Sequence, residues 1–419
     1  RRRGTPTRFS PPYTPPTAPA DPVRVHPPQK RGIMHTPTLR RSARAGLALV
    51  ASACLLASCQ NPDSGPEEET SAPPPESTAS DSPTSPRPAT TEATDTSATE
   101  NEGPRATAEG HVVVLSTGGT IASTHDKTGA VVPTVTGSKL VEPLSGTFDN
   151  DKLTLEVKDI AKLDSSAMTL DDTDTIIKAV DQELRRDDVD GVVVTHGTDS
   201  MEETAIAVDT FQDSDKPVAL TGAMRPFDDP DPDGPDNLAL AVKTVTDPAN
   251  RGRGTFIAFA DHVIPARGAF KSDTSKADGF ANNNGEKQPK RPKALKHQPL
   301  GNTRVDIIAA YPGAPADLIQ RSLDSGAEGI VIEGMGAGNI GDELAQAAQA
   351  AAKKVPVVLT TRVDHGPVEG IYGGAGGGAT LADAGVISSG TLRAPQARML
   401  LAAAITTDTD PAELFPDAD

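Results

Sequence analysis

Two short polar stretches, each directly after an apolar run, carry the residues of this chain that could do chemistry. LSTGGTIAST at 115–124 contains Thr120 beside a Gly-Gly pair, and THGTDSMEET at 195–204 contains Thr198 followed by Asp199. A threonine hydroxyl becomes a nucleophile when a neighbouring group takes its proton, and a lysine held near a carboxylate can serve as that base. The pattern therefore points to nucleophilic chemistry by a hydroxyl.

Other kinds of site fit these stretches less well. The Gly-Gly pair lets the backbone turn close to a small ligand, with Thr117 and Thr120 on either side. Neither G-x-G-x-x-G nor the Gly-Lys-Thr of a P-loop is present, so a nucleotide site is weakly indicated. The histidines follow no Ser-His-Asp order that would indicate a triad, and no His/Cys spacing typical of metal ligands occurs. We therefore expect no metal site.

A simpler interpretation of the second stretch is that it only begins a helix. Asp199 or Ser200 would cap the first turn, while Glu202 and Glu203 would complement the helix dipole. Capping leaves Thr198 and an aspartate at a strand tip unexplained. Two strand ends that each carry a threonine predict one shared cleft.

The elements that position these loops belong to an α/β fold. Continuous β-branched runs alternate with helix-period stretches, among them 201–211 and 394–406, which predicts a mostly parallel sheet flanked by helices. Ligand sites in such sheets lie beyond the carboxyl ends of the strands. We expect two α/β domains: a larger N-terminal catalytic domain over 109–288 and a smaller, Rossmann-like C-terminal domain over 303–419. Between them, 289–302 is basic and proline-containing and is predicted to be a linker.

The N-terminal part has three compositions. Residues 1–33 are rich in Pro and Arg and are predicted to be disordered or translated from upstream of Met34. Residues 34–58 have a basic region, a short apolar region and small residues at the end, which is typical of a secretion signal too short to span a bilayer. Residues 59–108 consist largely of Ser, Thr, Pro and Glu, which predicts a disordered tether.

The signal ends at Leu56-Ala57-Ser58-Cys59, which resembles the lipobox of bacterial lipoproteins. That resemblance implies cleavage before Cys59 and lipidation of its thiol, whereas the alternative is an ordinary secretory signal with a chance cysteine. We expect an exported lipoprotein anchored to the extracytoplasmic side of a membrane. Cys54 would be removed with the signal, so the mature fold would contain no disulfide.

The charge of the mature chain limits its partners. Residues 59–419 contain 30 Lys and Arg against 57 Asp and Glu. Such an acidic surface repels phosphate backbones, so we expect no nucleic-acid binding.

Several motifs together resemble the bacterial L-asparaginase family. They are TGGTIA and HGTDSMEETA in the two threonine loops, then TGAMRP, DGPDNL, GMGAGN and SSGTLRAPQARMLLAAAIT, and the likeness extends over 109–419. The resemblance implies hydrolysis of the side-chain amide of L-asparagine to L-aspartate and ammonia through a threonine acyl-enzyme, with no cofactor.

The resemblance also implies roles for individual residues. Thr120 matches the nucleophile, Thr198 the second catalytic threonine, and Lys271 the lysine that hydrogen-bonds it. Asp199 would complete that group and grip the substrate α-ammonium, while Ser165 would bind the α-carboxylate. Backbone N–H groups of the glycine-rich and Thr198 turns would stabilise the oxyanion. Without the family likeness, Lys271 would be interpreted as a solvated surface lysine.

The rest of the implied site includes departures from the family. Gly119 lies in the nucleophile loop, and Ser166 stands where the well-studied secreted enzymes have a glutamine. Asn339 would come from a neighbouring subunit of a homotetramer, and Glu369 is the nearest candidate for a late substrate-binding glutamate. Those enzymes also have a lid tyrosine, whereas this chain has no tyrosine between 109 and 310.

Three functions remain open at the level of sequence. The first is an L-asparaginase, and the second is a glutaminase-asparaginase, which shares the chemistry but also accepts L-glutamine. The third is a non-catalytic, membrane-tethered amino-acid-binding lipoprotein. The lipobox and the missing tyrosine favour the third, whereas the intact set of Thr120, Thr198, Asp199 and Lys271 favours catalysis.

Overall fold

The computed structural model describes residues 108–285 and 289–415. The predicted signal segment, the lipidation site at Cys59 and nearly all of the predicted tether lie outside the described residues. Ala108, assigned to the tether from its sequence, is only 4% exposed and packs in the core. The tether prediction therefore reaches at least one residue too far.

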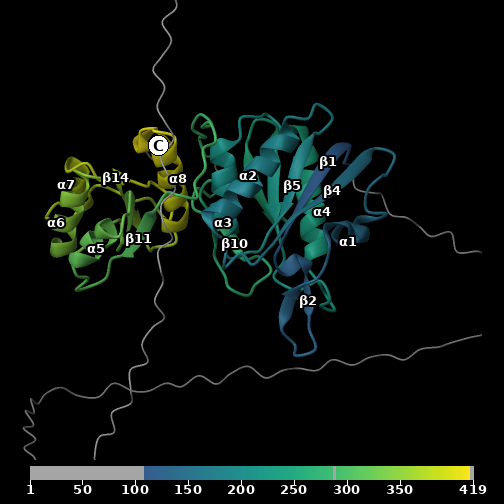
Figure 1. Ribbon diagram of the computed structural model, residues 1–419, viewed down its shortest axis with the longest axis horizontal. Coiled ribbons are helices and arrows are strands. Elements are labelled where there is room, and N and C mark those ends of the chain that lie inside the picture. Colours follow the sequence, from purple (N-terminus) through teal and green to yellow (C-terminus); the bar gives the residue numbers. More distant parts are fainter. Residues whose placement is uncertain (1–107, 286–288, 416–419) are drawn as a thin grey trace, which may run out of the picture. The chain divides into compact units, whose positions relative to one another are not determined.

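The first sheet has six strands, of which five are parallel and only the edge strand β8 is antiparallel to its neighbour (Figure 1). In spatial order the strands are β4 (Leu153–Leu163), β1 (Gly110–Gly118), β5 (Gly191–Thr195), β6 (Val218–Thr221), β7 (Thr255–Phe259) and β8 (His262–Pro265). All five residues of β5 are buried, as its continuous apolar run predicts.

Helices cover both faces of this sheet. They are α1 (Gly137–Val141), α2 (Leu170–Leu184), α3 (Met201–Phe211) and α4 (Gly234–Thr246). Val113 and Leu115 of β1 face α2 and α3, while Val112 and Val114 belong to the opposite core with α1 and α4. This alternation follows from the two-residue period of a strand.

The second sheet has four parallel strands and a smaller core of its own. Its strands are β11 (Val305–Ala309), β12 (Gly329–Gly334), β13 (Val357–Thr361) and β14 (Ile387–Ser388), and its helices are α5 (Asp317–Asp324), α6 (Asp342–Ala351), α7 (Gly378–Asp383) and α8 (Ala394–Thr406). Helices α5, α6 and α7 pack in one cluster, whereas α8 packs between this sheet and α3. The predicted class, two α/β domains with the larger one first, is confirmed.

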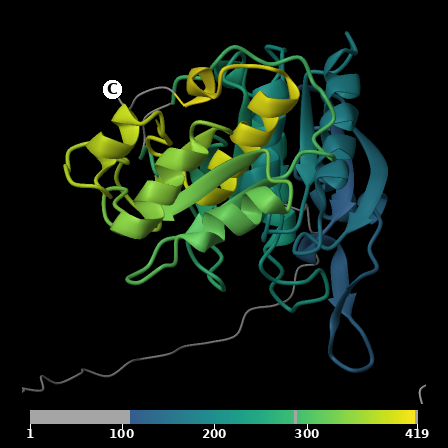
Figure 2. The same cartoon turned by 60° about the vertical axis from the view of Figure 1, so that its left-hand side comes forward.

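Two small hairpins complete the part of the first domain that surrounds the site. One pairs β2 (Ser123–His125) with β3 (Val131–Pro133), and the other pairs β9 (Ala269–Lys271) with β10 (Phe280–Asn282). The β2–β3 hairpin projects from the body of its domain, as Figure 2 shows.

The segment 289–302 has no helix or strand, yet it is bonded to the first domain. The Arg291 guanidinium lies 2.8 Å from the buried Asp209 carboxylate of α3. His297 lies 2.8 Å from Asp174 of α2. The predicted linker therefore lies along these two helices.

Candidate active site

A cavity of about 360 Å³ lies at the carboxyl ends of β1 and β5, where both threonine loops meet. Its lining comes from these loops, from the loop after β4, from hairpin β2–β3, from the turn after β6 and from β9. The residues are Gly119, Thr120, Ser123, Val131, Pro133, Leu163, Asp164, Ser165, Gly197, Thr198, Asp199, Ala223, Met224, Lys271 and Thr274. The structure thus brings the two predicted loops into one cleft.

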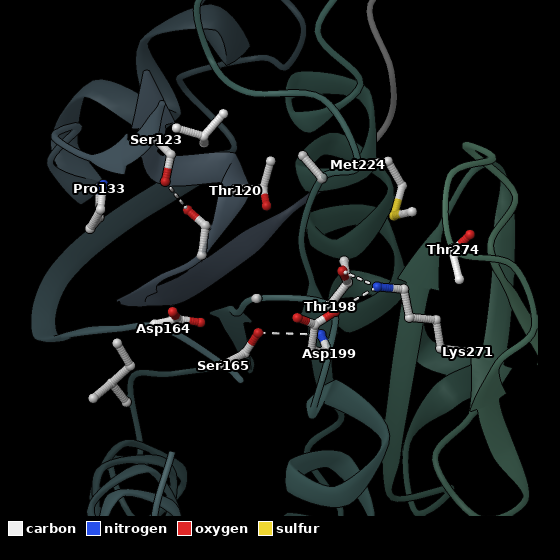
Figure 3. Close-up of a pocket in the computed structure, with 15 residues that line it drawn as sticks. Thr120, Ser123, Pro133, Asp164, Ser165, Thr198, Asp199, Met224, Lys271 and Thr274 are labelled. Carbon is white, nitrogen blue, oxygen red and sulfur yellow. Dashed lines mark hydrogen bonds and ion pairs between the residues drawn. The ribbon is translucent and has the colours of Figure 1, made fainter. Parts of the chain in front are cut away.

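Close packing of two glycines sets the position of Thr120. Gly119 has φ 80°, and a Cβ added there would lie 2.5 Å from the Gly197 Cα, so the two loops touch backbone to backbone. Thr120 then begins a short 3₁₀ helix, and Ser123 at its end donates a 2.8 Å hydrogen bond back to the Gly119 carbonyl. Thr120 faces the cavity from the side opposite Thr198 and Lys271 (Figure 3).

Lys271 connects Thr198 with Asp199 (Figure 3). Its Nζ lies 3.0 Å from Thr198 Oγ1 and 2.7 Å from Asp199 Oδ1. The lysine side chain is 21% exposed, and Thr198 is 7% exposed. The interpretation of Lys271 as a solvated surface lysine is therefore wrong.

Ser165 brings the loop after β4 against the Asp199 turn. Its Oγ accepts the Asp199 N–H at 3.3 Å, and its carbonyl accepts the Ser200 hydroxyl at 2.7 Å. Because Ser165 Oγ is an acceptor in the first of these bonds, its own proton remains available for a ligand in the cavity.

The simple capping interpretation of this turn is wrong. Ser200 occupies the N-cap position of α3 but makes no capping bond with its side chain, which bonds Ser165 instead. Glu202 accepts the Lys271 backbone N–H at 2.5 Å, and Glu203 pairs with Arg398 of α8 at 3.1 Å. Burial raises the pKa of Glu202 to about 7 and also raises the pKa of Glu203.

Two polar residues of the loops brace the site from outside the cavity. The buried Thr117 hydroxyl donates to the Thr195 carbonyl at 2.7 Å, so it does not flank a ligand as its sequence position predicts. His196 is fully buried, with Nδ1 2.6 Å from the Gly197 carbonyl and Nε2 3.0 Å from the Thr204 hydroxyl. Burial lowers the pKa of His196 to about 4, so the ring is neutral at pH 7 and Nδ1 carries its proton.

Three predicted substrate-binding residues do not line this cavity. The Ser166 N–H and hydroxyl both bond Asp164 Oδ1, at 2.9 and 2.8 Å. Ser166 lines an adjacent cavity of about 260 Å³ together with Ser165. Asn339 lines a separate cavity of about 280 Å³ in the second domain, and Glu369 is an exposed residue of that domain.

Some lining residues were not predicted as part of the site. Thr274 follows Lys271 by three residues, and Met224 lies in the TGAMRP motif. Val131 and Pro133 belong to the segment HDKTGAVVPTVTG, whose position after the nucleophile loop indicates a lid but not which of its side chains face inward.

A latch holds the β2–β3 hairpin to the turn after β6. The backbone N–H and Nδ1 of His125 lie 2.9 and 3.0 Å from the two carboxylate oxygens of Asp228. The Phe227 N–H donates to the Ser123 carbonyl at 2.8 Å. The His125 backbone bond is the main cause of a lowered pKa of Asp228. Two walls of the cavity are tied together by these contacts.

Within residues 108–285 and 289–415, no His, Cys, Asp or Glu side chains form a group of three or more able to hold a metal ion. In the same residues, no helix has the length and apolar character needed to cross a membrane.

Family profiles match both halves of the described chain. Residues 111–291 match the profile described as Asparaginase, N-terminal, and residues 304–415 match the Glutaminase/Asparaginase C-terminal domain. The chain belongs to the asparaginase family. In this asparaginase-family chain, every residue that lines the cavity falls within the N-terminal match.

Individual relatives cover most of the chain. L-asparaginase 2 of Bacillus subtilis is 32% identical over 331 residues, which is 73% of this chain and 84% of that protein. The probable periplasmic L-asparaginase of Haemophilus influenzae is 32% identical over 322 residues, 72% of this chain and 90% of that protein. The crystal structure of a probable cytoplasmic L-asparaginase from Campylobacter jejuni superposes with a TM-score of 0.64 at 30% identity, covering 74% of this chain and all of that one.

Proposed function

We propose that this protein hydrolyses the side-chain amide of L-asparagine, giving L-aspartate and ammonia. The observation that carries the proposal is the contact of Lys271 Nζ with Thr198 and Asp199 in the cavity that also holds Thr120. The relatives that share most of the chain are named L-asparaginases. The same contacts favour turnover over binding alone, because a binding protein would need no amine beside a second hydroxyl.

The proposed reaction proceeds through an ester of Thr120. Its Oγ bonds to the amide carbon as a proton leaves the hydroxyl, and the carbon–nitrogen bond then breaks with release of ammonia. Water next attacks the ester carbon, so that aspartate departs and Thr120 regains its proton. Thr198, with Lys271 and Asp199, would take up and return the protons.

The zwitterionic part of the substrate needs a fixed anion and fixed donors. Asp199 is the proposed partner of the α-ammonium, and the free hydroxyl proton of Ser165 is the proposed donor to the α-carboxylate. Gly119 would shape the floor beneath the reacting carbon.

Backbone donors for the developing oxyanion are limited. The Gly119 N–H already donates to the Leu163 carbonyl at 3.3 Å. The N–H groups of Thr120 and Thr198 have no acceptor in the described part of the chain. We therefore propose these two groups as the oxyanion donors.

The test is release of ammonia from L-asparagine by the full chain beside two variants. Thr120→Ala should abolish turnover, and Lys271→Ala should lower kcat by about 100-fold or more because the proton acceptor is lost. Thr124→Ala is the control, since its hydroxyl bonds Thr134 on the hairpin outside the cavity. Ammonia release that survives in Thr120→Ala would refute the proposed nucleophile.

L-glutamine is the second candidate substrate, because the C-terminal family domain is described as Glutaminase/Asparaginase. It differs from L-asparagine by one methylene, and a pocket discriminates such a difference by about 10- to 200-fold. Measuring kcat/KM for both amides decides whether the protein is an asparaginase or a glutaminase-asparaginase.

We also propose the cellular form of the protein. The Leu56-Ala57-Ser58-Cys59 motif supports an exported lipoprotein lipidated at Cys59, and the Haemophilus influenzae relative is named periplasmic. Incorporation of labelled fatty acid that disappears in Cys59→Ala would support the anchor. A homotetramer in which Asn339 and Glu369 complete a neighbour's site is the proposed assembly. A monomeric mass by light scattering of the active protein would contradict it.

A further inference from the structure

The buried carboxyl of Glu202 contacts the residue that supplies the amine of the cavity. Glu202 lies in the first turn of α3, is 9% exposed and does not line the cavity. Its Oε2 accepts the backbone N–H of Lys271 at 2.5 Å. A carboxylate that accepts an N–H forms a stronger bond than a neutral acceptor does.

Both ends of Lys271 are therefore held by the same short stretch of chain. The side-chain amine contacts Thr198 and Asp199, which directly precede α3, and the backbone N–H contacts Glu202 within α3. A lysine side chain has four rotatable bonds and loses much of its freedom when both ends are fixed. One rigid helix start thus sets the position of the amine relative to the Thr198 hydroxyl.

Gln396 of α8 supports this arrangement from the second domain. Its side chain, 1% exposed, accepts the Gly268 N–H at 2.8 Å and donates to the Ala266 carbonyl at 2.7 Å, just before β9. It also donates to the Glu202 carbonyl at 3.2 Å. The start of α3 and the approach to β9 are thereby joined through one amide.

A carboxyl at this buried position is unfavourable for stability. Burial raises the pKa of Glu202 to about 7, whereas a neutral amide could accept the same N–H without that penalty. The charged groups that face it are Lys271, which favours its ionised form, and Glu203, which opposes it and is itself paired with Arg398. Because Glu202 bonds the backbone of Lys271, its titration connects the pH to the position of the Lys271 amine.

We propose that Glu202 is a positioning residue for Lys271 and that its carboxylate holds the lysine in register with Thr198 during amide hydrolysis. This inference rests on the proposed function. Glu202→Ala removes the acceptor and should lower kcat by about 10- to 100-fold, because a small displacement of a catalytic group has that effect. The KM should change by less than about 3-fold, since Glu202 lies outside the cavity.

The experiment compares kcat and KM of the full chain across pH for wild type, Glu202→Ala and Glu202→Gln, with Glu203→Gln as the matched control. Wild-type kcat should rise as Glu202 ionises near pH 7, whereas Glu202→Gln has only a neutral acceptor and should stay near the low-pH level of wild type at every pH. Glu203→Gln should keep the wild-type kcat and its rise with pH. A folded Glu202→Ala with wild-type kcat would overturn the inference. A pH profile of kcat in Glu202→Gln that matches wild type would also overturn it, and this second comparison is the test if Glu202→Ala does not fold. A wild type that releases no ammonia would instead refute the proposed function.

Discussion

Two buried threonine hydroxyls, close together in the fold, differ in what they contact. Thr198 accepts a hydrogen bond from Lys271 within the cavity, and Thr117 donates one to the Thr195 carbonyl outside it. Thr198→Val preserves the shape of the side chain and removes only the oxygen. We expect kcat to fall by about 100- to 10,000-fold, which is the usual contribution of a proton-transfer group.

Thr117→Val is the control for that prediction. It should lower the free energy of unfolding by about 1 kcal/mol, the typical value of one hydrogen bond, and should leave kcat nearly unchanged. Equal losses of kcat in the two variants would contradict the assignment of Thr198 to catalysis. Steady-state ammonia release and urea denaturation provide the two measurements.

At the scale of elements, contact between the two loops depends on the lack of a side chain at Gly119. In Gly119→Ala the new Cβ would meet the backbone of Gly197, so the loops must separate and Thr120 must move. We expect kcat to fall at least about 100-fold. Gly129→Ala at the hairpin tip is the control: its φ, 84°, is similarly positive, but nothing lies within 4 Å of the added Cβ. An equal loss of kcat in Gly119→Ala and Gly129→Ala would show that the loss comes from backbone strain and not from separation of the two loops.

The hairpin latch supports a second prediction at this scale. His125→Ala removes the ring contact to Asp228 but keeps the backbone bond, which loosens the hairpin that carries Val131 and Pro133. We expect KM for L-asparagine to rise about 3- to 10-fold, equivalent to roughly 1 kcal/mol. Lys127→Ala, an exposed residue of the same hairpin, should leave KM unchanged. An effect on kcat alone would argue against a role of the latch in binding.

The sequence predicted the long elements better than the contacts between them. The helical patterns at 201–211 and 394–406 coincide with α3 and α8, because apolar period and Pro or polar boundaries are local signals. The eleven-residue strand β4 was not singled out, since its residues LTLEVKDIAKL alternate in polarity and most are only partly buried. The orientation of Ser166 depends on a turn in which its N–H bonds Asp164. The role of Ser200 depends on a bond to Ser165, 35 residues away. No local sequence pattern encodes either contact.

At the scale of the whole molecule, the buried carboxyl of Glu202 makes stability depend on pH. Its pKa is raised from 4.5 to about 7 in the folded protein. The contribution of the protonated carboxyl to the free energy of unfolding is therefore fully present below pH 4.5 and is lost as the pH rises through 7. Above pH 7 the penalty amounts to roughly 3 kcal/mol. We therefore expect Glu202→Gln to gain stability relative to wild type by about that amount between pH 4.5 and pH 8.5.

Urea denaturation of both proteins at the two pH values measures this difference. Glu203→Gln serves again as the control; because Glu203 is paired with Arg398, the gain should be smaller. A difference between wild type and Glu202→Gln that does not change with pH would mean that the Glu202 carboxyl has the same pKa in the folded and unfolded states.

The bonded path of residues 289–302 determines where the protein could be divided. Asp209 and Asp174 are almost fully buried, and their partners Arg291 and His297 lie in that path. A fragment that stopped before 289 would bury both carboxyl groups without these two partners, a loss that usually costs several kcal/mol. Expression of the catalytic half by itself, or its fusion to another protein, should therefore retain the chain through Leu300.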